Sequence, residues 1–212
     1  MEINLRNYEF GKESDLVGMP LTPNINQFLD KLPDELISVL NKIALANGGV
    51  WLVGGAVRDA ALGIYPNDID IATDLEPASL LTIFPNAIET GIAFGTITIK
   101  SGKYHFQTTT LRSEENYSDN RRPNSVNWET SLKSDLERRD FTINAMAIDV
   151  ARELLYDPHN GRNDISRGII RAVGNAYQRL SEDGLRIMRA YRFSDRKDKG
   201  VCYLENSLVV SI

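Results

Sequence analysis

Apolar residues early in the chain recur first at helical and then at strand spacing. Acidic residues follow Pro33, and both features are favourable at the start of a helix. The apolar stripe of this helix consists of Leu36, Val39, Leu40 and Ile43. Gly48-Gly49 ends it, and the continuous apolar run 50–53 predicts a short buried strand. A Gly54-Gly55 turn then leads into a helix that opens at Ala56.

Polar and apolar residues alternate over residues 67–73, which predicts a second strand. Asp68 and Asp70 are its acidic members. Side chains two apart on a strand share a face, with their backbones about 7 Å apart. We therefore expect both carboxylates on one side of the strand.

A short helix, a hairpin and a long polar stretch are predicted next. The helix covers residues 77–83. Alternation over 96–99, a Ser101-Gly102 turn and a return strand over 104–111 predict the hairpin. Residues 113–134 are polar and lack a period, which predicts a long connecting loop of functional or simply solvated character.

Two arginine-rich segments lie in the second half of the chain. Residues 135–147 combine a helical apolar stripe with the adjacent Arg138 and Arg139. Neighbouring side chains on a helix point in different directions, so we expect at most one of these two to reach a ligand. The other possibility is that both belong to a solvated face.

Residues 182–193 predict a helix with arginines at every third position. They are Arg186, Arg189 and Arg192. Leu185, Met188 and Ile187 are expected to supply its buried side. The arginine row is either a salt-bridged exposed face or, with Asp183, an edge that hydrogen-bonds a nucleobase, because Asp accepts and Arg donates.

Composition narrows the function classes. The 212 residues are 42% hydrophobic and 25% charged, as is usual for a soluble globular protein of one or two domains. The net charge of −5 gives no global basic signature, so any RNA contact depends on local clusters. A single cysteine, Cys202, and two histidines, His105 and His159, exclude a Cys/His zinc framework and a disulfide scaffold. A reducing cytoplasm fits, and no apolar run approaches the roughly 18 residues of a membrane span.

The glycine turn and the two aspartates carry the candidate chemistry. Amides of Gly54 and Gly55 at a helix start can approach an anion closely, and Arg58 in the first helical turn could hold a phosphate. Paired carboxylates such as Asp68 and Asp70 suit a pair of Mg²⁺ ions. The alternative is a strand end with two solvated acids.

Taken together, residues 32–193 resemble the class II tRNA nucleotidyltransferases, which are the CCA-adding enzymes, and the related bacterial poly(A) polymerases. Gly-Gly-Ala-Val-Arg-Asp (54–59) and Asp-Ile-Asp-Ile-Ala-Thr (68–73) are similar to the family's catalytic motif. Glu-Arg-Arg-Asp-Phe-Thr-Ile-Asn-Ala (137–145) is similar to its ribose-contacting motif. Glu-Asp-Gly-Leu-Arg (182–186) is similar to the template that selects C or A by protein hydrogen bonds.

The resemblance implies residue roles and a fold. Asp68 and Asp70 bind the metal, and together with Arg58 they are the implied catalytic residues. The implied nucleotide-binding residues are Gly54, Gly55, Arg58, Arg139, Asp140, Asn144, Glu182, Asp183, Arg186, Arg189 and Arg192. The implied fold is α+β, with a mixed twisted sheet flanked by helices. We assign residues 1–31 to an N-terminal extension, 32–175 to the nucleotidyltransferase head and 176–212 to the start of a truncated helical neck.

The implied activity is addition of CMP and AMP from CTP and ATP to the 3′ end of tRNA, with two Mg²⁺ ions. Alternatives are a poly(A) polymerase, an enzyme that adds only CC or only A, and a non-catalytic head that binds RNA or nucleotides. The chain departs from the family in two respects. Gln107 stands where a third acid is expected, and the chain stops at Ile212, whereas family members continue into helical body and tail domains.

Overall fold

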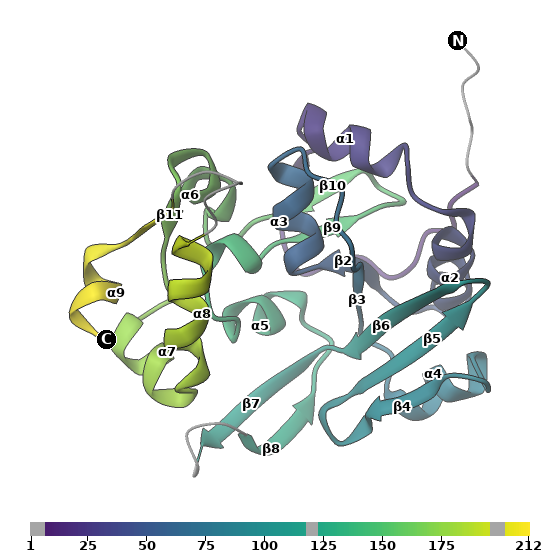
Figure 1. The fold of residues 1–212 in the computed structure, drawn as a ribbon. Helices are drawn as coiled ribbons and strands as arrows, with labels where there is room; N and C mark the ends of the chain where they lie inside the picture. Colours follow the sequence, from purple (N-terminus) through teal and green to yellow (C-terminus); the bar gives the residue numbers. More distant parts are fainter. Residues whose placement is uncertain (1–6, 118–122, 196–201) are drawn as a thin grey trace.

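A twisted mixed sheet with helices beside it forms the centre of the protein (Figure 1). The computed structural model describes residues 7–117, 123–195 and 202–212. Over these residues the predicted α+β class with a mixed sheet is confirmed. No helix in the described ranges is both long enough and apolar enough to cross a lipid bilayer.

The main sheet has eight strands within the described residues. Their order is β1 (Met19–Pro20), β10 (Leu154–Tyr156), β9 (Ala147–Asp149), β2 (Val50–Val53), β3 (Asp70–Thr73), β6 (Tyr104–Thr110), β5 (Thr96–Ser101) and β4 (Ile88–Gly91). Only β3 and β6 run parallel among these neighbours. Two further strand pairs join β7 (Arg112–Tyr117) to β8 (Pro123–Trp128) and β11 (Ile169–Ile170) to β12 (Tyr203–Leu204).

The helices lie around the sheet and beyond one side of it (Figure 1). They are α1 (Pro23–Leu29), α2 (Asp34–Leu45), α3 (Gly55–Ala61), α4 (Pro77–Ile83), α5 (Leu132–Glu137), α6 (Gly161–Arg167), α7 (Ala176–Glu182), α8 (Leu185–Ser194) and α9 (Asn206–Val210). Short 3-10 turns are η1 (Ile92–Phe94) and η2 (Thr142–Asn144). In Figure 1, α7, α8 and α9 form a separate group on the left, and α5 lies between this group and the sheet.

Alternation along β2 gives the sheet two buried faces. Leu52 packs into the large core beneath α1, α2 and α3, whereas Trp51 and Val53 pack into a smaller core with α5. A third core joins the group of α7, α8 and α9 to the rest of the protein. In it, the rings of Phe141 and Phe193 meet edge to face at 5.8 Å. The group on the left of Figure 1 is therefore attached through apolar packing.

Most elements predicted from local patterns are present. The helix after Pro33, the strand 50–53, the helix 77–83 and the hairpin around Ser101-Gly102 are all confirmed. The strand predicted over 67–73 is shorter, since β3 begins only at Asp70. Asp68 lies in the bend that precedes it.

Residues 19–29, within the segment assigned to an N-terminal extension, form a strand and a helix that belong to the main fold. Strand β1 pairs with β10 at the edge of the main sheet. Helix α1 is capped by the Thr22 side chain and buries Ile25 and Phe28 in the large core. A helix of 7 residues, about two turns, is too short for a clear apolar period, which explains why the sequence pattern missed it.

Two predictions for the middle of the chain also need correction. The loop predicted over 113–134 is in large part the ribbon of β7 and β8, although residues 118–122 lie outside the described ranges. The helix predicted over 135–147 ends at Glu137 and is followed by the turn η2. This early end lets successive side chains of the segment point into one region, as described below.

We predict that α1 is an integral part of the fold. Ile25→Ala should lower the free energy of unfolding by about 2–5 kcal/mol, because it leaves a cavity under a fully buried side chain. Gln27→Ala, on the exposed side of the same helix, is the matched control. Urea unfolding of both variants measures the difference, and similar stabilities would show that α1 does not pack in solution.

Candidate active site

A cavity of about 700 Å³ opens between the sheet and α8. Its lining residues come from β2, α3, β3, η1, β5, β6, the start of β7, the end of α5, η2 and α8. They are Val53, Gly54, Gly55, Arg58, Asp70, Ile71, Phe94, Thr96, Gln107, Thr109, Arg112, Arg138, Arg139, Asp140, Asn144, Asp183, Arg186, Arg189, Arg192 and Phe193. The three motifs that are far apart in the sequence thus meet in one hollow.

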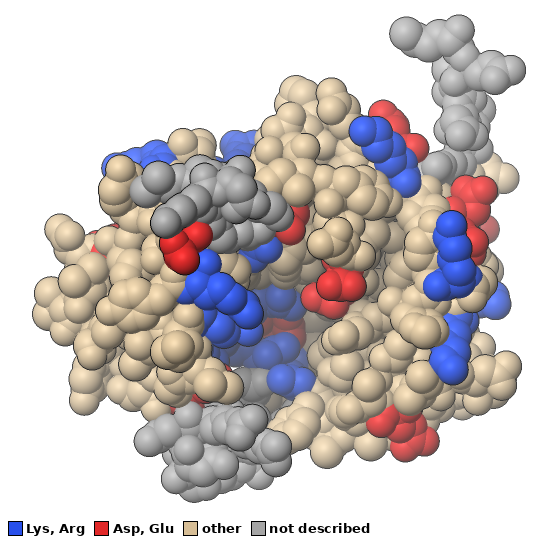
Figure 2. Space-filling model, viewed as in Figure 1, with Lys and Arg blue, Asp and Glu red and all other residues tan. Residues whose placement is uncertain are grey.

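The cavity is strongly basic although the chain is acidic. Among the described lining residues, seven are arginines and three are aspartates, a formal excess of four positive charges. The whole chain carries a net charge of −5. Figure 2 shows blue side chains gathered in the central hollow. A site of this sign attracts polyanions such as a nucleoside triphosphate.

Asp70 lies at the start of β3, opposite Val53 of β2. Burial raises the pKa of the Asp70 carboxyl, Arg139 opposes that rise, and the charge of Asp68 adds to it. Asp68 is exposed and does not line the cavity, but its charge acts on Asp70. Within the described residues, no side chain donates a hydrogen bond to the Asp70 carboxylate. Asp68 and Asp70 therefore form a pair of acids that act on each other and that a cation can reach.

Gln107 lies on the strand beside Asp70. Ile71 pairs with Thr108 in the parallel β3–β6 register, so Asp70 and Gln107, each one residue earlier, face the same side of the sheet. Both line the cavity. The amide thus occupies the place on β6 at which the family resemblance implies a third acid. An amide oxygen can coordinate a cation but cannot act as a base.

These side chains fit a hard divalent cation. The donors are the carboxylates of Asp68 and Asp70 and the amide oxygen of Gln107, and Mg²⁺ prefers oxygen ligands. No cluster of three or more His, Cys, Asp or Glu side chains with metal-binding geometry occurs in the part of the chain that the structure describes. A magnesium site here consequently depends on two carboxylates, with further ligands from substrate phosphates or water.

The glycine turn brings the backbone against the charged groups. Gly54 has φ +70°, and a β-carbon built on it would lie 3.2 Å from Arg139 Nη1 and 3.8 Å from Asp70 Oδ2. Gly55 begins α3, so its amide lies at the helix N-terminus. A side chain at Gly54 would be strained and would crowd Arg139, which explains the requirement for glycine.

Arg58 has several protein partners. Its Nε and Nη2 donate to Asp59 Oδ1 at 3.0 and 2.9 Å, and its Nη1 donates to Asn144 Oδ1 at 2.7 Å. Its guanidinium also lies 5.0 Å from the ring centre of Phe193 on α8. Arg58 lines the cavity, and its guanidinium both pairs with Asp59 of its own helix and contacts η2 and α8 through Asn144 and Phe193.

Asp140 extends this connection to α8. Its Oδ1 accepts hydrogen bonds from the Phe141 amide at 2.8 Å and from Asn144 Nδ2 at 3.2 Å. Its Oδ2 lies 2.7 Å from Arg189 Nε in an ion pair whose angles fall outside those of a hydrogen bond. Asp140 and Asn144 therefore link α3 to α8, in agreement with their place in the cavity wall.

Both Arg138 and Arg139 line the cavity, which corrects the expectation that only one could reach a ligand. The cause is the end of α5 at Glu137, one residue before them. The fully buried Asp135 receives both guanidinium groups, with Nη2 of Arg138 at 2.6 Å and Nη2 of Arg139 at 3.0 Å. Burial alone would raise the pKa of Asp135, but the two arginines outweigh it and lower the pKa to about 2.

The side chains of α8 are arranged differently from the sequence prediction. Arg186 is buried, while Leu185 and Met188, expected on the buried side, are 51% and 67% exposed. The inner side of α8 consists of Arg186, Ala190 and Phe193. The error arises because Arg186 has acceptors on the facing segment, so an arginine takes the inner position that periodicity assigned to leucine.

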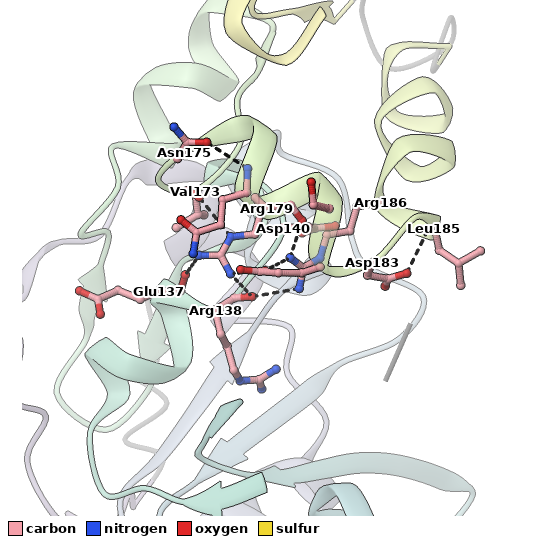
Figure 3. Close-up of polar contacts among 12 residues, drawn as sticks. Glu137, Arg138, Asp140, Val173, Asn175, Arg179, Asp183, Leu185 and Arg186 are labelled. Carbon is pink, nitrogen blue, oxygen red and sulfur yellow. Dashed lines mark hydrogen bonds and ion pairs between the residues drawn. The ribbon is translucent and has the colours of Figure 1, made fainter. Parts of the chain in front are cut away.

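Asp183 and Arg186 line the cavity, but Glu182 does not. Instead, Glu182 Oε2 accepts hydrogen bonds from Nη1 of Arg186 at 2.6 Å and from Nη1 of Arg179 at 2.9 Å. Asp183 Oδ1 accepts only the Leu185 amide among the described hydrogen bonds, at 2.9 Å, so its other oxygen is available (Figure 3). Glu182 is therefore a support for Arg186.

Comparison with known proteins identifies the family. Residues 50–171 match the model of the family described as "Poly A polymerase head domain". The chain belongs to this family. The CCA-adding enzyme of Lactococcus lactis subsp. lactis (strain IL1403) is 44% identical over 176 residues, which cover 80% of this chain and 44% of that enzyme. The CCA-adding enzyme of Streptococcus mutans serotype c (strain ATCC 700610 / UA159) is 44% identical over 78% of this chain and 42% of its own.

Solved structures agree with this assignment. The Bacillus stearothermophilus CCA-adding enzyme in complex with CTP has a TM-score of 0.74 and 34% identity, over 91% of this chain and 43% of its own. The Thermotoga maritima CCA-adding enzyme complexed with tRNA has a TM-score of 0.69 and 26% identity, over 91% of this chain and 45% of its own. The chain spans less than half the length of these relatives.

For this poly(A) polymerase head domain, the structure also shows cavity residues that the sequence did not single out. They are Phe94, Thr96, Thr109 and Arg112. Arg112 follows the predicted return strand directly and donates to the Phe94 carbonyl. A basic residue directly after a predicted strand was a usable signal. Phe94 lies in a turn without any pattern, so its place depends on tertiary contacts.

We predict that Asp135 stabilises the protein in its ionised form. The pKa of Asp135 is lower in the folded state than in the unfolded state. Its contribution to the free energy of unfolding is therefore full above pH 4 and is lost as the pH falls from 3.8 towards 2. Asp135→Asn should lower the free energy of unfolding at pH 7 by about 2 kcal/mol. Urea unfolding at pH 3 should show a loss of roughly half that size. Equal losses at both pH values would exclude the ion pairs as the cause, and exposed Asp30→Asn is the control.

Proposed function

We propose that this cavity transfers CMP and AMP from CTP and ATP to the 3′ end of tRNA without a nucleic-acid template. One observation carries the proposal. Asp70 on β3 and the Asp183–Arg186 pair on the neck segment (residues 176–212) line the same arginine-rich cavity. A metal-binding acid and a base-reading pair on one cavity are what a self-templating nucleotidyltransferase needs.

Relatives support the choice of substrates. Solved structures similar to this chain contain CTP, or a primer tRNA with an incoming ATP analogue. Because the chain covers less than half of those proteins, their substrates come to it only by proposal. A cytoplasmic location likewise stays a prediction.

The reacting end would lie beside Asp70. Asp68 and Asp70 would hold two Mg²⁺ ions, which when bound activate the attacking hydroxyl and neutralise the triphosphate. The amides of the Gly54-Gly55 turn are open to a phosphate because no β-carbon intervenes. Arg139, next to Gly54, and Arg189 and Arg192 on α8 supply positive charge to the same cavity. Arg58 would act mainly by holding Asn144 and Phe193 in place.

The base would be read by Asp183 and Arg186. Cytosine offers an amino donor and a ring-nitrogen acceptor, which match the free Asp183 oxygen and an Arg186 N–H. Uracil replaces the amino group with a carbonyl, which would place two acceptors against each other. Each such mismatch costs about 1–3 kcal/mol when buried.

Addition of only CC or only A, and poly(A) synthesis, use the same site and are separated only by assay. A non-catalytic head that binds RNA or nucleotides is favoured by one observation, which is the amide of Gln107 beside Asp70. Binding of CTP without incorporation would support this second candidate.

We predict that Asp68→Ala and Asp70→Ala each lower incorporation by roughly a hundredfold or more, because each removes half of the carboxylate pair. Radiolabelled CTP and ATP are supplied with a tRNA that lacks its CCA end and saturating Mg²⁺. Asp30→Asn, at the exposed end of α1, should keep full activity. Activity within tenfold of the unsubstituted chain in either alanine variant would refute the metal assignment.

We predict that Asp183→Ala changes nucleotide choice more than turnover. The preference for CTP over UTP in kcat/KM should fall about tenfold, since the acceptor that rejects uracil is lost. Single-nucleotide incorporation with each triphosphate gives the ratio. If activity fell while the ratio stayed constant, Asp183 would serve the loop between α7 and α8 instead of the base.

A further inference from the structure

Arg179, on α7, is absent from the cavity lining and yet connects its two walls. Its Nε donates to the Val173 carbonyl at 3.2 Å, and its Nη2 donates to the Glu137 carbonyl at 2.9 Å. Its Nη1 donates to the Arg138 carbonyl at 3.3 Å and to Glu182 Oε2 at 2.9 Å. Figure 3 shows this guanidinium between the end of α5 and the neck segment.

The two α5 contacts have an electrostatic reason. The Glu137 and Arg138 carbonyls lie at the C-terminus of α5, where helix carbonyls lack partners and carry partial negative charge. A guanidinium with donors in a rigid plane can satisfy both at once. Arg179 therefore attaches α7 directly to the segment that carries Arg138 and Arg139 into the cavity.

The same guanidinium determines the surroundings of Arg186. Glu182 Oε2 is shared by Arg179 and Arg186, and the Arg138 carbonyl also accepts from both. The Arg179 carbonyl takes a further hydrogen bond from Arg186 Nη1, at 2.8 Å. Two of the three described acceptors of Arg186 therefore also bind the Arg179 guanidinium, and the third is the Arg179 carbonyl.

These contacts decide which edge of Arg186 remains for a ligand. An arginine has five N–H bonds. Within the described residues, two acceptors lie at Arg186 Nη1 and one at Nη2. The Nε–H and one Nη2–H therefore have no acceptor there, and they are the donor pair that is left. Since Arg186 lines the cavity, this pair is what it can offer to a base.

We propose that Arg179 is a positioning residue for nucleotide choice, acting through Glu182 and Arg186 without contacting the nucleotide. The inference rests on the proposed function. Loss of the Arg179 guanidinium removes one of the two donors to Glu182 Oε2 and to the Arg138 carbonyl, and it removes the Arg179 donor from the Glu137 carbonyl. Arg186 then turns towards these acceptors, and the donor pair no longer has one fixed orientation.

The test is titration of the whole chain with CTP and with UTP by calorimetry in the presence of Mg²⁺. In Arg179→Gln, the ratio of the two affinities should fall about tenfold, chiefly through weaker CTP binding. Arg179→Lys keeps the charge that pairs with Glu182 but has one nitrogen for several acceptors, so it should restore part of the ratio. Arg171→Gln is the matched control, because Arg171 also forms ion pairs, with Asp164 and Glu205, but lies outside the cavity.

A double substitution separates positioning from general support. In an Arg186→Ala background, Arg179→Gln should not change the affinity ratio further, because its route through Arg186 is already absent. A second fall of similar size would overturn the inference, as would an unchanged ratio in Arg179→Gln alone. If circular dichroism shows Arg179→Gln to be unfolded, Arg179→Lys carries the same test, and an unchanged ratio there overturns the inference. Failure of the unsubstituted chain to bind CTP would overturn the proposed function as well.

Discussion

The mutual repulsion of seven arginines in one cavity is the constraint on which the site depends. Like charges at close range in a partly buried site are costly unless acids accompany them. The structure places these acids mainly behind the arginines. Asp135 holds Arg138 and Arg139, and Glu182 holds Arg186 together with Arg179 outside the cavity. Each acid thus orients guanidinium groups, while the face towards the cavity stays positive.

This arrangement gives the cavity a preorganised electrostatic field. The buried carboxylate of Asp135 has a strongly lowered pKa, so it stays ionised throughout the physiological range. The arginines it holds cannot easily turn towards solvent. A triphosphate that enters meets donors whose orientation has already been fixed, which is the condition for effective charge stabilisation in a reaction. This field requires that each buried ion has a partner of opposite charge.

The sheet and the neck segment contribute different parts of the site. The sheet supplies an acid and an amide from adjacent strands, since the parallel β3–β6 register brings Asp70 and Gln107 to one face. The neck segment supplies Asp183 and Arg186. Apolar contact between Phe141 and Phe193 and the polar contacts of Arg179 hold the two together. Under the proposed function, metal binding and base choice would therefore depend on different parts of the fold.

The sequence by itself determined the local elements and the motif residues. The strand 50–53, the glycine turn, α3 and the hairpin β5–β6 follow from short-range spacing and turn chemistry, which depend on neighbours in the chain. Tertiary structure decided which side chains became buried. Arg186 lies inward and Leu185 outward, Arg58 is engaged by Asn144, and α1 belongs to the core. The physical reason is that burial of an arginine depends on acceptors about 40 to 90 residues away, which no local period contains.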